Sequence, residues 1–258
     1  MSVDACADLV ARGDPDRFRS VLAAPPAARG RLLVLYAFNV EVSRAPWVTA
    51  EPLIAGMRLQ WWADALAEIG AGKGARTHEV VSPLAQVIRA HGLPVALFTD
   101  LIAARRSDIG REPPADGAAL DGYLEATSGN LMWLAALALG ADPGAEAVVR
   151  DFAHAAGLAA YLRAVPALTA AGRQPLPSGP AGDVVALARG GLARLAAARV
   201  ARRRVARRAA PALLAGWRAE ATLRAAAAAP ERVFAGDLEQ SPYRRRFTLA
   251  WRGVTGRW

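Results

Sequence analysis

Three pairs of acidic residues are spaced so that both carboxylates of a pair would lie on one face of an α-helix. The pairs are Asp4/Asp8, Asp64/Glu68 and Asp121/Glu125. Carboxylate oxygens are the ligands that Mg²⁺ prefers, which makes each pair a weak candidate for a metal site. A solvated helix face is the favoured interpretation for all three, and we therefore predict no metal site in this chain.

Arginine supplies almost all of the positive charge, because Lys73 is the only lysine and the net charge is +9. Such a chain attracts anionic partners: diphosphates, acidic lipid headgroups or acidic proteins. The densest basic stretch consists of the arginines at positions 199, 202, 203, 204, 207 and 208. A solvated helix face is favoured there, followed by a membrane-surface or partner patch. Nucleic acid is an unlikely partner because no recognised nucleic-acid motif accompanies the charge.

Other kinds of catalytic motif are missing from the sequence. The three histidines, His78, His91 and His154, are scattered, and we find no metal-ligand pair, Gly-rich phosphate loop or nucleophile motif. The single cysteine, Cys6, excludes an internal disulfide. With acids near the start and no apolar run of the ~20 residues that span a bilayer, the sequence predicts neither a signal peptide nor a transmembrane helix. The expected location is cytoplasmic, or peripheral on the inner face of a bacterial plasma membrane.

The elements that would position these residues all have the period of a helix. A composition of 53% hydrophobic residues, rich in Ala, suits one large helical core. We predict a single all-α bundle of at least eight helices over residues 1–258, with a proline-containing loop at Gly172–Gly182 and a basic, aromatic tail at Asp237–Trp258. The predicted helices are Arg31–Arg44, Pro52–Ile69, Pro83–Ala90, Pro94–Ser107, Leu120–Leu139, Ala145–Leu168, a long helix from the N-cap Asp183 to Ala209, and a last one that ends at Ala229.

Four sequence blocks resemble the squalene/phytoene synthase family, in its order and with its spacing, over about residues 18–177. They are LYAFN at 35–39, EPL with RLQWWADAL at 51–53 and 58–66, YLEATSG at 123–129, and GRQPLP at 172–177. Asp108 resembles an acidic position of a middle helix in that family. The resemblance implies a helical bundle of the isoprenoid synthase type, with residues 183–258 as a basic helical part of the same domain.

Active members of this family hold Mg²⁺ between two aspartate motifs on facing helices. The metal stabilises a departing diphosphate, and two prenyl diphosphates are then joined head to head. Aligned to those motifs, this chain has no carboxylate at any of the metal-ligand positions. In the first motif, the positions are occupied by Ser43, Arg44 and Trp47. In the second motif, Ala160 replaces the family's asparagine, and Ala164 and Leu168 replace its two acids. The second motif's arginine survives as Arg163.

The resemblance also implies a pocket between the Tyr36 and Tyr161 helices. Its candidate residues are Tyr36, Phe38, Asn39, Arg44, Arg58, Trp62, Tyr123, Thr127, Gly129, Tyr161, Arg163 and Arg173. The aromatic side chains have two interpretations. They pack in the core, with Arg58 in contact with Trp61 or Trp62, or they form the wall of a prenyl-chain pocket. Arg44, Arg163 and Arg173 would bind a diphosphate or lipid phosphate if they line one cavity. Otherwise they form salt bridges to Glu41, Glu51 or Glu125.

Three functional hypotheses follow. The favoured one is an inactive member, as in the branch that includes the mitochondrial complex I assembly factor, which would act as an assembly factor or lipid-binding adaptor for a membrane-arm subunit. It needs no cofactor and would bind a prenyl diphosphate or anionic lipid. The second is an active prenyltransferase with rearranged ligands, for which Mg²⁺ would be expected. The third is a basic helical adaptor with a filled cavity.

Overall fold

The computed structural model of the protein describes residues 3–49 and 51–258, and no β-strand occurs in these ranges. The all-α prediction is confirmed. The α-helices are α1 Val3–Gly13, α2 Pro15–Leu22, α3 Pro26–Arg44, α4 Pro52–Gly70, α5 Val81–His91, α6 Val95–Arg105, α7 Gly117–Leu124, α8 Asn130–Ala138, α9 Glu146–Ala170, α10 Val184–Val200, α11 Ala219–Ala228, α12 Glu231–Ala235 and α13 Pro242–Thr255.

Helix boundaries follow local chemistry. Proline occupies the first turn of α2, α3, α4 and α13, where its missing N–H costs no hydrogen bond. Carboxylates of Asp14, Asp116 and Asp183 accept backbone N–H groups at the starts of α2, α7 and α10, so the predicted N-cap at Asp183 is confirmed. Gly92 and Gly236 end α5 and α12 in the left-handed conformation that glycine adopts without strain.

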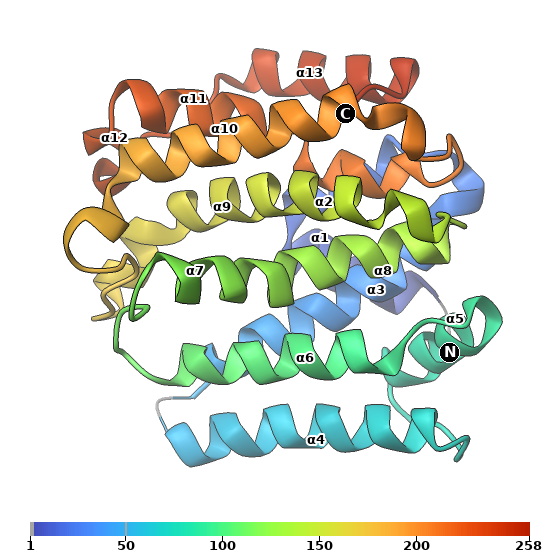
Figure 1. Ribbon diagram of the computed structural model, residues 1–258. Helices are drawn as coiled ribbons and strands as arrows, with labels where there is room; N and C mark the ends of the chain where they lie inside the picture. The colour runs from blue at the N-terminus through green and yellow to red at the C-terminus, as the bar shows by residue number, and fades with distance from the viewer. Residues whose placement is uncertain (1–2, 50) are drawn as a thin grey trace.

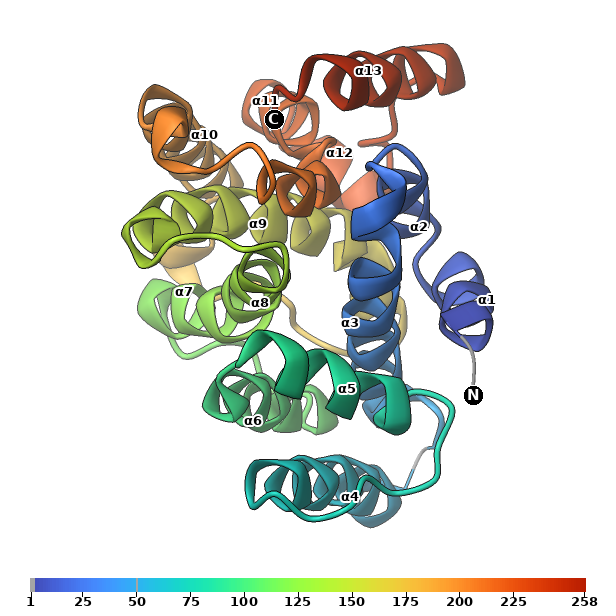
Figure 2. The same cartoon turned by 90° about the vertical axis from the view of Figure 1, so that its right-hand side faces the viewer.

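Helix α9 runs through the middle of the bundle (Figures 1 and 2). It contacts α10, α11 and α12 on one side and α7 and α8 on the other. Helix α3 crosses beside α8, and nearly all of its residues from Leu32 to Val42 are buried. Helices α4 and α13 lie at opposite ends of the molecule in both views. No helix in the described ranges is long and apolar enough to cross a bilayer.

Several predicted boundaries were wrong, and α12 and α13 follow the helix that was predicted as the last one. Helix α3 begins at Pro26, five residues before the predicted Arg31, and α1 and α2 precede it where no helix was predicted. The helix expected to reach Ala209 ends at Val200, and a 3₁₀ turn at Arg202–Arg204 follows. Alanine and arginine both have high helix propensity, so nothing in the local composition marks this break. The segment predicted as Leu120–Leu139 is α7 and α8 joined by a π-helical turn, η3, at Glu125–Gly129.

Candidate functional site

A cavity of about 790 Å³ opens along α9. Small residues make the space: Gly157, Ala160, Ala164 and Ala167 recur every three or four positions, so they form one stripe of α9 with no bulky side chain. The π-turn η3, the 3₁₀ turns η1 (Ala45–Trp47) and η2 (Arg106–Ile109), and the loop after α9 supply the other walls. The fold therefore contains a cleft that is open to solvent and large enough for a small-molecule ligand.

Residues of both aspartate-motif positions meet at this cavity. Ser43 and Trp47 line it from α3 and η1, and Ala160, Ala164 and Leu168 line it from α9. Their side chains carry no carboxylate. The alignment therefore selected positions from two distant segments that line the same cavity.

Arg44 does not belong to this wall. Its side chain is exposed and lies outside the residues that line the cavity, whereas its neighbour Ser43 lines it. Successive residues of a helix point about 100° apart, which separates the two side chains. Arg44, a candidate pocket residue, therefore does not line the cavity.

Arg163 and Arg173 also lie at different pockets, so the alternative in which Arg44, Arg163 and Arg173 line one cavity does not hold. Arg163 points to a smaller neighbouring pocket and pairs with Asp16 at 2.9 Å. Arg173 lines the large cavity, with its guanidinium carbon 4.3 Å from the centre of the Trp47 ring. Neither pairs with Glu41, Glu51 or Glu125 among the described residues.

The acids at the large cavity are Asp108 and Glu112. Asp108 accepts hydrogen bonds from Arg105 and from the Tyr123 hydroxyl, each at 3.0 Å, and lies 3.8 Å from Arg173. Burial, despite the opposing charge of Arg105, raises the pKa of Tyr123, which therefore stays a hydrogen-bond donor. The carboxylate is thus already occupied by three partners of this chain.

These donors do not fit a magnesium cluster. Mg²⁺ needs near-octahedral oxygen ligation by carboxylates and substrate phosphates, and the two acids here, of which Asp108 is already paired with arginine, are too few to hold a cluster of such ions. Across residues 3–49 and 51–258, no group of three or more His, Cys, Asp or Glu side chains is arranged to hold a metal ion.

Positively charged side chains outnumber the acids on the wall of the large cavity. Arg17, Arg105, Arg106 and Arg173 line the large cavity, against the two acids. Tyr161 donates its hydroxyl to the Pro175 carbonyl at 2.6 Å and so ties the loop after α9 to the cavity rim. Guanidinium groups match phosphate oxygens in geometry and charge. The arrangement suits an anionic head with an apolar body.

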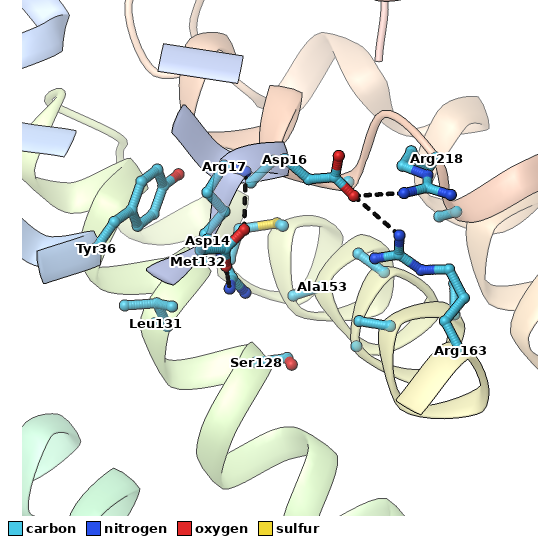
Figure 3. A pocket seen from close by; sticks show the side chains of 17 residues that line it. Asp14, Asp16, Arg17, Tyr36, Ser128, Leu131, Met132, Ala153, Arg163 and Arg218 are labelled. Carbon is cyan, nitrogen blue, oxygen red and sulfur yellow. Dashed lines mark hydrogen bonds and ion pairs between the residues drawn. The ribbon is translucent and has the colours of Figure 1, made fainter. Parts of the chain in front are cut away.

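A second pocket, of about 80 Å³, adjoins the first and shares Arg17, Ser128, Gly157 and Ala160 with it. Figure 3 shows Asp16 there between Arg163 and Arg218, with Asp14 bonded to Arg17. The sequence interpretation missed both aspartates because it found no helix before Arg31. Asp14 followed by Pro15 is a helix-start signal that would have indicated α2.

Several candidate pocket residues lie away from the large cavity. Phe38 and Trp62 pack edge-to-face at 5.5 Å in the core, and Tyr36 is buried beside the smaller pocket. Arg58 is exposed, and the cation over Trp61 is Arg76. The expected Arg58–tryptophan contact was therefore wrong.

The remaining candidates divide between wall and core. Thr127 and Tyr123 line the large cavity, and the Thr127 hydroxyl donates to the Tyr123 carbonyl at 2.6 Å. Asn39 is buried in α3, and Gly129 lies against the Glu125 carboxyl group.

Some residues of the acid pairs and of the arginine stretch form ion pairs within the chain. Glu68 binds Arg76 at 2.7 Å, and Asp121 lies 2.7 Å from His154. Of the arginine stretch, Arg199 on α10 pairs with Glu220 at 2.7 Å. The other five follow the end of α10, so they do not form a face of one long helix.

The helix arrangement is that of an isoprenoid synthase. The crystal structure of a dehydrosqualene synthase in complex with ligand is similar to 98% of this chain over 95% of its own length, at a TM-score of 0.81 and 15% sequence identity. The crystal structure of squalene synthase HpnC from Alicyclobacillus acidocaldarius matches 90% of this chain and 94% of its own, at a TM-score of 0.73 and 19% sequence identity.

The family follows from the sequence match. The squalene/phytoene synthase profile matches residues 10–251, and the chain belongs to that family. A complex I assembly factor 6 homolog from Drosophila melanogaster is 30% identical over 182 residues, 67% of this chain and 52% of that protein. Human complex I assembly factor 6 is 25% identical over 163 residues, which are 62% of this chain and 48% of that protein. The chain thus spans about half the length of these relatives.

Proposed function

We propose that this protein is a catalytically inactive family member that holds an anionic amphiphile in its cavity without metal and acts in the assembly of respiratory complex I. One observation carries the proposal. The cavity is retained, but Ser43, Trp47, Ala164 and Leu168 line it where active relatives would place metal-binding carboxylates.

The cavity walls support an amphiphilic ligand. Alanines of α9 with Leu168 provide an apolar surface, while Arg105, Arg106 and Arg173 provide positive charge. A prenyl diphosphate or a lipid phosphate combines the two chemistries. Binding such a head would not ionise it, because the charge that develops on a leaving diphosphate needs stabilisation that bound metal supplies.

The role in complex I assembly rests on the relatives. Complex I assembly factor 6 of Drosophila and human resembles this chain over roughly two thirds of its length. We propose that the shared part performs the same kind of task here, through a membrane-arm subunit.

The first test measures catalysis. With Mg²⁺ and farnesyl or geranylgeranyl diphosphate, we expect no diphosphate release above a control without protein. Stabilisation of transition-state charge is worth several kcal/mol, and each ~1.4 kcal/mol is a tenfold change in rate. Squalene, presqualene diphosphate or phytoene above the control would establish the active prenyltransferase instead.

The second test measures binding by calorimetry with EDTA present. The ligands are farnesyl thiodiphosphate and a short-chain phosphatidylglycerol kept below its micelle concentration. Wild type should bind at least one of them, and binding should weaken with salt. Arg173→Gln, inside the cavity, should weaken it roughly tenfold, the loss of one charge-assisted contact. Arg44→Gln, outside, is the matched control. No binding by wild type, or equal binding by both variants, would exclude an anion site in this cavity and favour an adaptor role that uses no cavity ligand.

The third test addresses assembly. Deleting the gene in its source organism should lower the amount of assembled, membrane-bound NADH dehydrogenase, and the wild-type gene should restore it. Normal enzyme levels together with loss of a C30 or C40 isoprenoid would contradict the assembly role and support the prenyltransferase.

A further inference from the structure

Helix α13 directs four large apolar side chains to solvent, and two of its arginines, Arg245 and Arg252, toward the protein. Tyr243, Phe247, Trp251 and Val254 are 84%, 72%, 54% and 88% exposed. At 100° per residue they fall on one stripe roughly 80° wide. We call these four residues the α13 stripe.

The opposite face of α13 is bound to the protein through arginines. Arg245 pairs with Glu239 at 2.5 Å, and Arg252 pairs with Glu220 at 3.5 Å. Gly253 packs on the end of α2, where a Cβ would lie 3.1 Å from the Ala23 carbonyl oxygen. The orientation of the helix is therefore set by specific contacts.

Both ends of α13 are also anchored. Leu238 before it is 3% exposed and Trp258 after it is 8% exposed. The Trp258 ring packs on Phe152 at 5.0 Å, and Arg199 donates to the Trp258 carbonyl oxygen at 3.1 Å. The α13 stripe thus belongs to a fixed helix, and its exposure costs hydrophobic stabilisation that a partner surface would recover.

The charges beside the α13 stripe indicate what covers it. Arg244 and Arg246 flank the stripe on either side of the helix, and Pro242–Trp258 contains no acid. Tyrosine and tryptophan favour the boundary between lipid headgroups and acyl chains. An apolar stripe bordered by arginines is typical of a helix that lies in the interface of an anionic bilayer.

We propose that α13 is a membrane-docking helix that seats the protein on an anionic phospholipid surface. The α13 stripe enters the headgroup boundary while Arg244 and Arg246 contact lipid phosphates. Docking in this way leaves α4, at the other end of the molecule, directed away from the membrane (Figures 1 and 2). It does not depend on what the cavity holds.

Flotation of the full chain with vesicles tests the proposal. Vesicles of 30% phosphatidylglycerol in phosphatidylcholine should carry the wild type upward, and pure phosphatidylcholine vesicles should carry at least tenfold less. Phe247→Ser with Trp251→Ser should reduce binding to the anionic vesicles at least tenfold. Arg244→Ser with Arg246→Ser should reduce it by a similar factor, because each arginine near such a surface contributes about fivefold.

Matched controls separate docking from other effects. Leu53→Ser with Met57→Ser removes apolar residues that are 75% and 63% exposed on α4, and should leave vesicle binding unchanged. Ala164→Trp, which fills the cavity, should also leave vesicle binding unchanged. Failure of the cavity proposal can therefore be told apart from failure of the docking proposal. Circular dichroism verifies that each variant is folded.

Three results would overturn the proposal. The first is that the wild type fails to float with anionic vesicles. The second is that the α13 and α4 variants lose vesicle binding equally. The third is that the wild type is a dimer by light scattering, and that Phe247→Ser with Trp251→Ser converts it to a monomer without affecting vesicle binding. The last result would assign the α13 stripe to an interface between two copies of this chain.

Discussion

Asp16 is a single carboxylate shared by two guanidinium groups from distant parts of the chain. Arg163 lies 2.9 Å from it and Arg218 lies 2.5 Å from it, and the Arg218 side chain is 7% exposed. Burial alone would raise the pKa of Asp16, but hydrogen bonds and charge from both arginines outweigh it and lower the pKa. Asp16 therefore links α2 to α9 and to the segment before α11.

We expect Asp16→Asn to lower the free energy of unfolding at pH 7 by about 2–4 kcal/mol, since it leaves a buried cation short of a partner. An acid whose pKa is lower in the folded state contributes its full stabilisation of the folded protein above its unfolded-state pKa of about 4. This contribution is lost as the pH falls through the folded-state pKa. The difference between wild type and variant in urea unfolding should therefore shrink below about pH 4. Asp64→Asn, at an exposed acid, is the control. An equal difference at pH 7 and pH 3 would contradict the assignment.

At the scale of elements, the π-turn η3 packs closely on α9. A Cβ on Gly157 would lie 2.5 Å from the Ser128 Oγ and 2.6 Å from its Cβ, closer than non-bonded atoms approach. Gly157 therefore permits the contact that sets one wall of both pockets. The π-turn places Ser128 and Thr127 toward the cavity in a helix that would otherwise continue regularly.

Gly157→Ala should lower the free energy of unfolding by about 1–3 kcal/mol through overpacking. Ser128→Gly removes the clashing atoms, so the double variant should recover part of the loss, and a double-mutant cycle in urea measures the coupling. Gly190→Ala, in α10 where a Cβ meets no atom within 4 Å, should instead stabilise by up to about 1 kcal/mol. Additive effects of the 128 and 157 changes would show that they do not touch.

The sequence predicted most helices because apolar residues recur with the helical period, and the family blocks located both walls of the cavity. The π-turn has no such signal: Glu125–Gly129 continues the same helical pattern as the residues around it. The partner of Arg163 was also out of reach, since Asp16 lies 147 positions away and pairing at that separation depends on packing. Arg44 was misplaced because an alignment assigns a position in the chain and not the direction of a side chain.

At the scale of the whole molecule, the large cavity is space that the fold maintains without filling it. Ala164→Trp adds a large side chain where the wall faces empty volume, so the midpoint of thermal unfolding should not fall, while binding of farnesyl thiodiphosphate should be lost. Ala155→Trp, at a fully buried position of the same helix, should destabilise by about 3 kcal/mol or more, or prevent folding. If the cavity variant retains the ligand, the ligand binds elsewhere.

Cys6 is the one cysteine of the chain, and it is fully buried in α1 with its thiol against the Glu79 carbonyl oxygen. Burial, with the nearby charge of Glu79, raises the pKa of this thiol to about 11, so almost no reactive thiolate exists at neutral pH. A maleimide dye should therefore not react with Cys6 in the folded protein. One cysteine introduced at Thr255 would then be the sole labelling site, and a polarity-sensitive dye there would report the approach of α13 to a bilayer in an otherwise unaltered chain.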